Sequence, residues 1–475
     1  MIKRRHFLNL AAMGTALAAT PLRAASPAPT LSLKRPPVKA RTYHSQAVED
    51  TLHKVAKEIE SPKLKQLFVN CFPNTLDTTV DFEFINNRPD TFIITGDIDA
   101  MWLRDSTAQV WPYLPFVHND EKIDLLIQGL INRQTTCILK DPYANAFYKD
   151  LSRPSKWASD EPTPEPGIHE RKWEIDSLCY AVRLGYHYWK ATGNNSPFDV
   201  RWRTAMIAAV DTFEAEQRWS GESDYRFVRS SPRMIDAPVF EGTGRPVKPN
   251  GLIASAFRPS DDATLFPFLI PSNIFAVISL RQLSEMASQI FNDQDFARRC
   301  DKMATQVDAA IKACAIKEHE GFGKIYAYEV DGFGNALFMD DANVPSLMSL
   351  AYLNPAFAQS PVYQNTRAFL LSDNNPYYLR GTAAEGQGSP HTGKHRIWPM
   401  GIILRAMTSQ SDEEITQCLQ WLCTTDANTG LMHEGFDKDD PSQYSRDWFA
   451  WANTLFGELI LKLQAERPAL LKLAL

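Results

Sequence analysis

The chain has 475 residues, of which 44% are hydrophobic and 22% are charged, and its formal net charge is −6. These values are typical of a globular protein with a substantial core, and the length allows between one and about three domains. No dense run of basic residues follows the N-terminus and no long apolar stretch occurs in the body of the chain, so we expect neither a nucleic-acid partner nor a membrane span in the mature chain.

The first 25 residues have the composition of an export signal: basic residues, then a weakly apolar alanine-rich segment, then small residues. The run Arg4-Arg5-x-Phe7-Leu8 resembles a twin-arginine signal. We expect residues 1–25 to direct export to the periplasm or the cell exterior by that route; the alternative is the basic start of an amphipathic helix. The seven cysteines are odd in number and show no disulfide framework, so we expect mostly free, buried thiols.

Residues 26–44 are rich in proline and small residues, which predicts a tether. Residues 45–475 show no second linker, and about eleven or twelve of their segments have apolar residues at helical spacing. The clearest helical segments are 123–131, 202–213, 296–311 and 448–463. Strand signals are short, at 91–95, 225–229 and 324–330, and they do not alternate with helices in βαβ fashion. We therefore expect one large, mostly helical domain.

The segment AFRPSDDATLFPFLIPSN, residues 256–273, places Asp261 and Asp262 side by side in an apolar run. Pro267 would interrupt a helix that began at Ser260, so we expect the two acids in a short turn and a helix that follows Ser272 as its N-cap. Apolar neighbours should then raise the pKa of at least one of the acids. The alternative is a helix capped by Ser260, with both acids in its first turn.

Five loops mix carboxylates with tryptophan, tyrosine or histidine, at 95–116, 170–180, 256–264, 380–399 and 431–453. Aromatic faces beside acids, arginine and asparagine suit a sugar, which offers apolar C–H faces ringed by hydroxyl groups, although a single tryptophan is more often part of a core. Zinc-protease, nucleotide-loop and serine-elbow motifs are absent from the sequence, and in the acidic run 437–445 Pro441 occupies a calcium-ligand position. We therefore expect paired-carboxylate chemistry with no metal and no cofactor.

Several blocks, in order from about residue 95 to 460, resemble glycoside hydrolase family 125: TGDIDAMWLRDSTAQ, EIDSLCY, FRPSDDA, MDDANVPSL, GSPHT and MHEGF. The resemblance implies an all-α fold, an (α/α)6 barrel, over residues 45–475. It also implies a metal-independent, inverting exo-α-1,6-mannosidase that releases terminal mannose from an α-mannoside or a mannose-containing glycan. We expect the enzyme to be a monomer.

The resemblance also implies the site residues. Asp261 corresponds to the general acid, which must be protonated; an apolar setting beside Asp262 would favour that protonated form. Glu434 corresponds to the general base. The residues expected to bind the sugar are Trp102, Arg104, Asp105, Asp262 and His391. A local ion pair is the alternative reading of Arg104-Asp105, and Asp176 matches a family block without an assigned role.

Three positions differ from the family pattern, and we expect them to affect leaving-group preference rather than chemistry: Asp99 in place of proline, Gly435 in place of serine, and the glycine-rich segment around Glu385. Two other functions stay open. One is a different (α/α)6 hydrolase or phosphorylase that acts on glucosides or uronides, and the other is a non-catalytic glycan-binding protein, which would be expected to lack one of the two carboxylates.

Overall fold

The computed structural model describes residues 34–475, so the predicted signal peptide and the first part of the predicted tether, residues 26–33, lie outside the described residues. The described end of the tether contacts the helical domain. Arg35 Nε donates to Asp77 Oδ2 at 2.6 Å, and Arg35 Nη1 donates to Glu49 Oε2 at 3.1 Å. Within residues 34–475, no helix combines the length and the apolar character that crossing a membrane requires.

Helices make up most of the regular secondary structure of the described residues. The α-helices are α1 (Gln46–Glu58), α2 (Pro62–Cys71), α3 (Asn74–Thr78), α4 (Leu103–Val110), α5 (Glu121–Lys140), α6 (Ile175–Thr192), α7 (Val200–Glu216), α8 (Ile270–Phe291), α9 (Gln294–Cys314), α10 (Leu350–Leu353), α11 (Pro361–Leu370), α12 (Pro399–Met407), α13 (Asp412–Thr424) and α14 (Ala450–Glu466). Short 3-10 helices are η1 (Val38–Ala40), η2 (Trp111–Phe116), η3 (Pro355–Gln359), η4 (Pro390–Thr392) and η5 (Pro468–Lys472). The helices expected at 123–131, 202–213, 296–311 and 448–463 are confirmed as α5, α7, α9 and α14.

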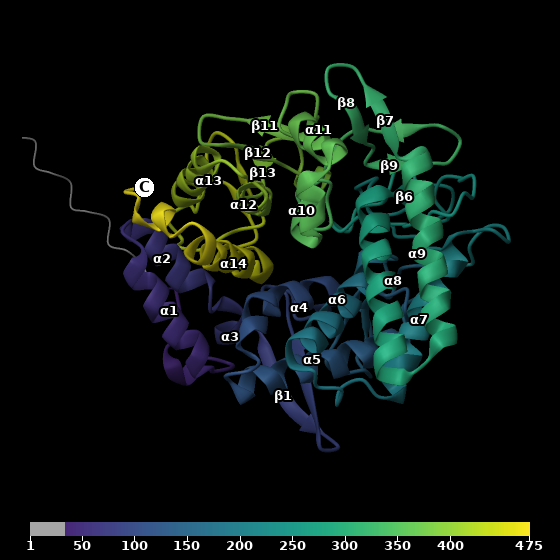
Figure 1. Ribbon diagram of the computed structural model, residues 1–475, viewed down its shortest axis with the longest axis horizontal. Coiled ribbons are helices and arrows are strands. Elements are labelled where there is room, and N and C mark those ends of the chain that lie inside the picture. Colours follow the sequence, from purple (N-terminus) through teal and green to yellow (C-terminus); the bar gives the residue numbers. More distant parts are fainter. Residues whose placement is uncertain (1–33) are drawn as a thin grey trace, which may run out of the picture. The chain divides into compact units, whose positions relative to one another are not determined.

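Twelve of the helices alternate along the chain between an outer and an inner position: α2, α5, α7, α9, α11 and α13 are outer, and α4, α6, α8, α10, α12 and α14 are inner. Neighbouring inner helices contact each other around a ring, in the order α10, α8, α6, α4, α14, α12, and Figure 1 shows α4 and α6 next to each other in its centre. The ring closes between α12 and the segment before α10, where Thr408 Oγ1 lies 3.7 Å from Met348 Sδ. This arrangement confirms the (α/α)6 barrel.

The outer and inner helices begin in different ways. Side chains of serine or aspartate cap the outer helices; Asp120, for example, accepts hydrogen bonds from the backbone of Lys122 and Ile123 at the start of α5. The inner helices α4, α6, α8, α12 and α14 have no side-chain cap at their N-caps, which are Trp102, Glu174, Leu269, Trp398 and Phe449. Uncapped N–H groups and the positive end of the helix dipole therefore gather at one end of the barrel.

The start of α8 differs from the prediction. The helix begins at Ile270, two residues before Ser272, because Pro271 fits the first turn, where a missing N–H costs nothing. Ser272 is therefore inside the helix and is not its cap. Asp261 and Asp262 lie in a turn outside any helix, as predicted.

The strands are short, and all pairings between them are antiparallel: β1 (Val80–Ile85), β2 (Arg88–Ile93), β3 (Met101–Trp102), β4 (Ala146–Phe147), β5 (Ile168–Glu170), β6 (Phe268–Leu269), β7 (Ile316–His319), β8 (Gly323–Tyr326), β9 (Glu329–Val330), β10 (Ala336–Leu337), β11 (Tyr378–Arg380), β12 (Glu385–Gln387), β13 (Arg396–Ile397), β14 (Gly435–Asp437) and β15 (Tyr444–Ser445). They form sheets of two or three strands. Strands β3, β6 and β13 lead into the inner helices α4, α8 and α12, so they sit at the same end as the uncapped N-termini.

Two strand predictions need correction. The segment 324–330 divides into β8 and β9, which belong to different sheets. Residues 225–229 form no strand, because only Val228 pairs, in an isolated bridge with Glu161. The prediction for the cysteines is confirmed: all seven are free, and six of them are buried.

Candidate active site

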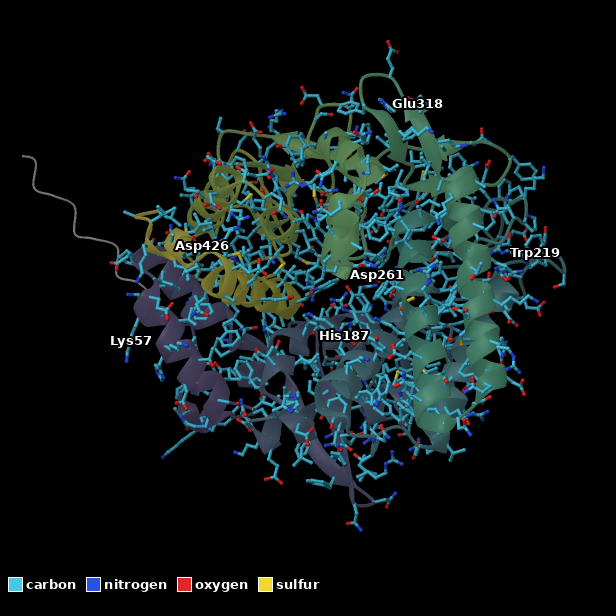
Figure 2. All side chains as sticks on the ribbon, viewed as in Figure 1. Lys57, His187, Trp219, Asp261, Glu318 and Asp426 are labelled. Atoms are coloured by element: carbon cyan, nitrogen blue, oxygen red, sulfur yellow. The ribbon has the colours of Figure 1, made fainter. Side chains whose placement is uncertain are left out.

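A cavity of about 390 Å³ lies where the inner helices begin. Figure 2 places Asp261 near the middle of the helical domain in that view, whereas Trp219 and Glu318 lie at its edge. Six of the seven residues expected from the sequence line this cavity: Trp102, Arg104, Asp105, Asp261, His391 and Glu434. Trp102 is the N-cap residue of α4, and Arg104 and Asp105 are in its first turn. All eight residues of α4, LRDSTAQV, are buried although most of them are polar.

Asp261 is held in a tight turn. Its backbone N–H donates to the carbonyl oxygen of Arg258 at 2.9 Å, and the N–H of Arg258 donates to the carbonyl oxygen of Asp262 at 2.8 Å. The φ of Asp261 is +65°, a left-handed conformation that residues other than glycine rarely adopt. This conformation costs backbone energy. It directs the Asp261 side chain into the cavity, whereas the Asp262 side chain points away from it.

Cations surround Asp261 instead of the expected apolar groups. Its Oδ1 lies 3.4 Å from Arg104 Nη2 and accepts a hydrogen bond from Asn145 Nδ2 at 3.3 Å. Lys172 Nζ donates to its backbone oxygen at 2.7 Å. Burial would raise the pKa of Asp261, but Arg104 and Lys172 outweigh burial and hold this pKa below its ordinary range. The free site therefore does not keep Asp261 protonated in the way its apolar sequence neighbours predict.

Arg104 is the centre of a buried charge cluster. Its Nη1 donates to Glu174 at 2.6 Å and to Asp176 at 3.2 Å, and its Nε lies 3.4 Å from Asp105. Arg104-Asp105 is thus not an isolated local pair. Burial raises the pKa of Glu174 well above its ordinary range and that of Asp176 to about 6, because one guanidinium cannot neutralise all of these carboxylates.

Asp262 does not line the cavity. Its side chain is fully buried behind His391, with Oδ1 3.0 Å from His391 Nδ1, and Arg233 Nη2 lies 3.6 Å from the same oxygen. Burial would lower the pKa of His391, but the hydrogen bond and charge of Asp262 outweigh burial and raise that pKa to about 9. The ring of His391 therefore faces the cavity as a cation at neutral pH.

Glu434 lies directly before β14 and is mostly buried. Ser445 Oγ donates to its Oε2 at 2.8 Å, and Arg446 Nη1 lies 3.8 Å from its Oε1. Arg446 is itself held by Asp97, whose Oδ1 accepts from Nε at 2.9 Å. His433 uses both ring nitrogens elsewhere: Nδ1 is 3.0 Å from the carbonyl oxygen of Arg446, and Nε2 lies beside Thr429.

The three positions that differ from the family pattern lie in different surroundings. Asp99 is exposed and pairs with Arg153 at 2.7 Å. A Cβ at Gly435 would lie 3.3 Å from the ring of Trp398, which lines the cavity, so a serine there would press on that wall. Glu385 pairs with Arg380 and is not a lining residue.

The loop at 170–180 mixes carboxylates with aromatic residues and is expected near a sugar, but its residues Glu170, Lys172 and Glu174 are not among the predicted site residues. Glu170, Lys172 and Glu174 are buried at the site, and Asp176 follows them at the start of α6. These residues alternate in HERKWEID, and an extended backbone places alternate side chains on one face. That alternation of charges was the available signal. Arg229, Arg446 and Trp451 also line the cavity. Arg446 and Trp451 lie in the candidate loop 431–453, but none of the three is among the predicted site residues.

Comparison with known proteins gives one consistent result. Residues 61–461 match the model of a protein family described as metal-independent alpha-mannosidase (GH125). The Meiotically up-regulated gene 157 protein of Schizosaccharomyces pombe is 42% identical over 460 residues, which cover 93% of this chain and 90% of that protein.

Solved structures agree with the sequence matches. A Streptococcus pneumoniae structure, described as a metal-independent alpha-mannosidase in a non-productive complex with α-1,6-mannobiose, is 40% identical with a TM-score of 0.86 and covers 90% of this chain and 100% of that one. A family GH78 rhamnosidase of Bacillus sp. GL1, 12% identical with a TM-score of 0.50, covers 89% of this chain and 36% of that one. At that identity the second likeness concerns the fold alone.

Proposed function

The chain belongs to glycoside hydrolase family 125, the metal-independent alpha-mannosidases, and on that premise we propose that it releases terminal mannose from α-1,6-linked mannosides with inversion of configuration. Membership of this family makes it an alpha-mannosidase, so a glucoside- or uronide-specific enzyme and a non-catalytic glycan-binding protein are no longer competing assignments. The linkage, the exo mode of action and the stereochemistry are the proposed part.

The observation that carries the proposal is that Asp261 and Glu434 reach one cavity from two separate elements, the turn before α8 and the start of β14. In an inverting hydrolase one carboxyl protonates the leaving oxygen while a second carboxylate activates water on the opposite face of the sugar. Asp261 takes the first role and Glu434 the second. Ser445 Oγ donates a hydrogen bond to Glu434 Oε2, and Arg446 Nη1 lies 3.8 Å from Glu434 Oε1, so both groups hold this carboxyl at the cavity.

The other lining groups support a sugar as ligand. Trp102 and Trp451 offer aromatic faces, and Arg104, Asp105 and His391 offer charged hydrogen-bonding groups beside them. The cavity volume lies in the range of small-molecule sites. The α-1,6 linkage is proposed from the mannobiose bound to the Streptococcus pneumoniae relative.

Proton NMR of α-1,6-mannobiose during hydrolysis tests the proposal. The first product should be β-mannose, which then equilibrates with the α anomer. Initial release of α-mannose would indicate a retaining mechanism. Mannobioses with α-1,2 and α-1,3 linkages serve as matched controls, and faster hydrolysis of either one would overturn the assigned linkage.

We also propose that the enzyme is exported by the twin-arginine route and acts as a monomer. Replacement of Arg4 and Arg5 by lysine should leave precursor in the cytoplasm, because that pathway reads the arginine pair. Mature protein outside the cytoplasm at the normal level would contradict the route. Light scattering after size-exclusion chromatography measures the mass, and a value of twice the chain mass would contradict the monomer.

A further inference from the structure

Glu174 and Asp261 are hydrogen-bonded to each other although both are carboxyl groups. Two carboxylates repel, so a hydrogen bond between them requires a proton on one of the pair. Glu174 Oε2 accepts from Arg104 Nη1 at 2.6 Å and from Ser177 Oγ at 3.0 Å. Its Oε1 is buried and takes no N–H or hydroxyl donor in the described residues, so no donor group competes with a proton on this oxygen.

The charges around the pair also require a retained proton. The groups that face it are Arg104 and Asp105 from α4, Asn145 from the loop before β4, His169 and Glu170 from β5, Lys172, Asp176 from α6 and His391 from η4. Arg104 and Lys172 are the cations in direct contact, since His391 is paired with Asp262 and Arg229 with Asp160 and Glu170. Carboxyl groups outnumber these cations, and an unpaired buried carboxylate takes up a proton rather than remain charged.

We propose that Glu174 holds the proton that Asp261 delivers to the leaving oxygen, so that the two side chains act as one acid. This inference rests on the proposed function, because it assigns the source of the acid's proton in that reaction. Glu174 does not line the cavity and acts through Asp261, so it is a positioning residue. The apparent pKa values of such a coupled pair describe the pair, so the pH profile reports on both members.

The two side chains differ in solvent exposure, and this difference explains how the proton moves from Glu174 to Asp261. The side chain of Asp261 is 24% exposed, whereas that of Glu174 is 0% exposed. In the free site the proton rests on Glu174, whose pKa burial raises, and Asp261 is ionised. A sugar in the cavity removes water from Asp261 alone, which destabilises its ionised form and shifts the proton towards it.

The protons and bonds of one hydrolysis cycle then balance. Asp261 transfers its proton to the glycosidic oxygen as the bond from that oxygen to the anomeric carbon breaks. The oxygen of water bonds to the anomeric carbon, and Glu434 accepts a proton from that water. Solvent carries the proton from Glu434 back to the pair of Glu174 and Asp261 once the products leave.

The variants Glu174→Gln and Asp176→Asn separate this role from a structural one. Both remove a carboxylate that contacts Arg104, but only Glu174 is hydrogen-bonded to Asp261. For α-1,6-mannobiose, Glu174→Gln should lower kcat by about 10²-fold or more and shift the basic limb of the pH profile down by about one unit or more. The Asp176→Asn shift should be less than half as large. A nitrophenyl mannoside, which needs little protonation, should lose far less activity in Glu174→Gln.

The outcomes distinguish this inference from the proposed function. A wild-type enzyme that does not hydrolyse α-1,6-mannobiose overturns both. An active wild type with an unchanged basic limb in Glu174→Gln, or with equal losses on both substrates, overturns the shared proton alone. If Glu174→Gln does not fold, infrared difference spectra of the wild type with and without mannose test the shared proton instead. A protonated-carboxyl band that changes on binding and is altered in Asp261→Asn supports the inference, and its absence overturns it.

Discussion

The turn that carries Asp261 depends on a buried ion pair, and Glu329→Gln tests that dependence. Glu329 is fully buried; its Oε1 accepts from Arg258 Nε at 2.6 Å, and its Oε2 accepts from the backbone N–H groups of Leu265 and Phe266 at 2.9 and 3.0 Å. The glutamine oxygen can still accept backbone hydrogen bonds, but the side chain carries no charge. The guanidinium of Arg258 would then be buried without its direct counter-ion.

Loss of one member of a buried ion pair costs about 3–5 kcal/mol of unfolding free energy. An unfolding entropy of about 2.1 cal/mol/K per residue amounts to about 0.9 kcal/mol/K for a domain of about 440 residues. The Tm should therefore fall by about 3–5 °C. Since Arg258 closes the turn around Asp261, turnover of α-1,6-mannobiose should fall as well, with no change in the anomer released.

Differential scanning calorimetry and steady-state kinetics measure the two effects. The double variant Arg258→Met with Glu329→Gln removes both charges and is the matched control; it should be more stable than Glu329→Gln alone. A Tm within about 1 °C of the wild type for Glu329→Gln would refute the reasoning, because the predicted shift is several times larger. A double variant less stable than the single one would show that charge burial is not the cause.

Three further predictions concern chemistry and pH. Asp261→Asn and Glu434→Gln should each slow hydrolysis of α-1,6-mannobiose by about 10²–10⁴-fold or more, and a nitrophenyl mannoside should partly rescue only Asp261→Asn; equal rescue would contradict the two roles. Activity should survive dialysis against a chelator, and a loss restored by calcium or zinc would contradict metal independence. Burial raises the pKa of Glu458 from 4.5 to about 7, although Arg183 and the hydrogen bond from Tyr352 oppose the shift. The folded state therefore binds a proton that the unfolded state releases, and stability should fall as pH rises through this range. Glu458→Gln should remove that part of the dependence of Tm on pH, and an unchanged profile would contradict it.

Local sequence was enough for the outer helices α5, α7 and α9 and for the position of the acid turn. The outer helix α9 has a single buried face that includes Phe296, Cys300, Met303 and Val307, and this gives the regular apolar spacing that predicts a helix. The inner helix α4 is buried on every side and carries arginine and aspartate towards the cavity, so its spacing carries no such signal. For α4 the family motif, rather than periodicity, pointed to the residues that line the cavity.

The sequence by itself predicted seven site residues, and six of them line the cavity, because the motifs around Trp102, Asp261, His391 and Glu434 are local. Only the tertiary structure decided the protonation of the acid and the placement of Asp262 behind His391. Arg104 stands 157 positions before Asp261 in the chain, yet its Nη2 lies 3.4 Å from Asp261 Oδ1. A pKa depends on charges and solvent within a few ångströms in space, and folding brings those groups together from parts of the chain that no local pattern connects.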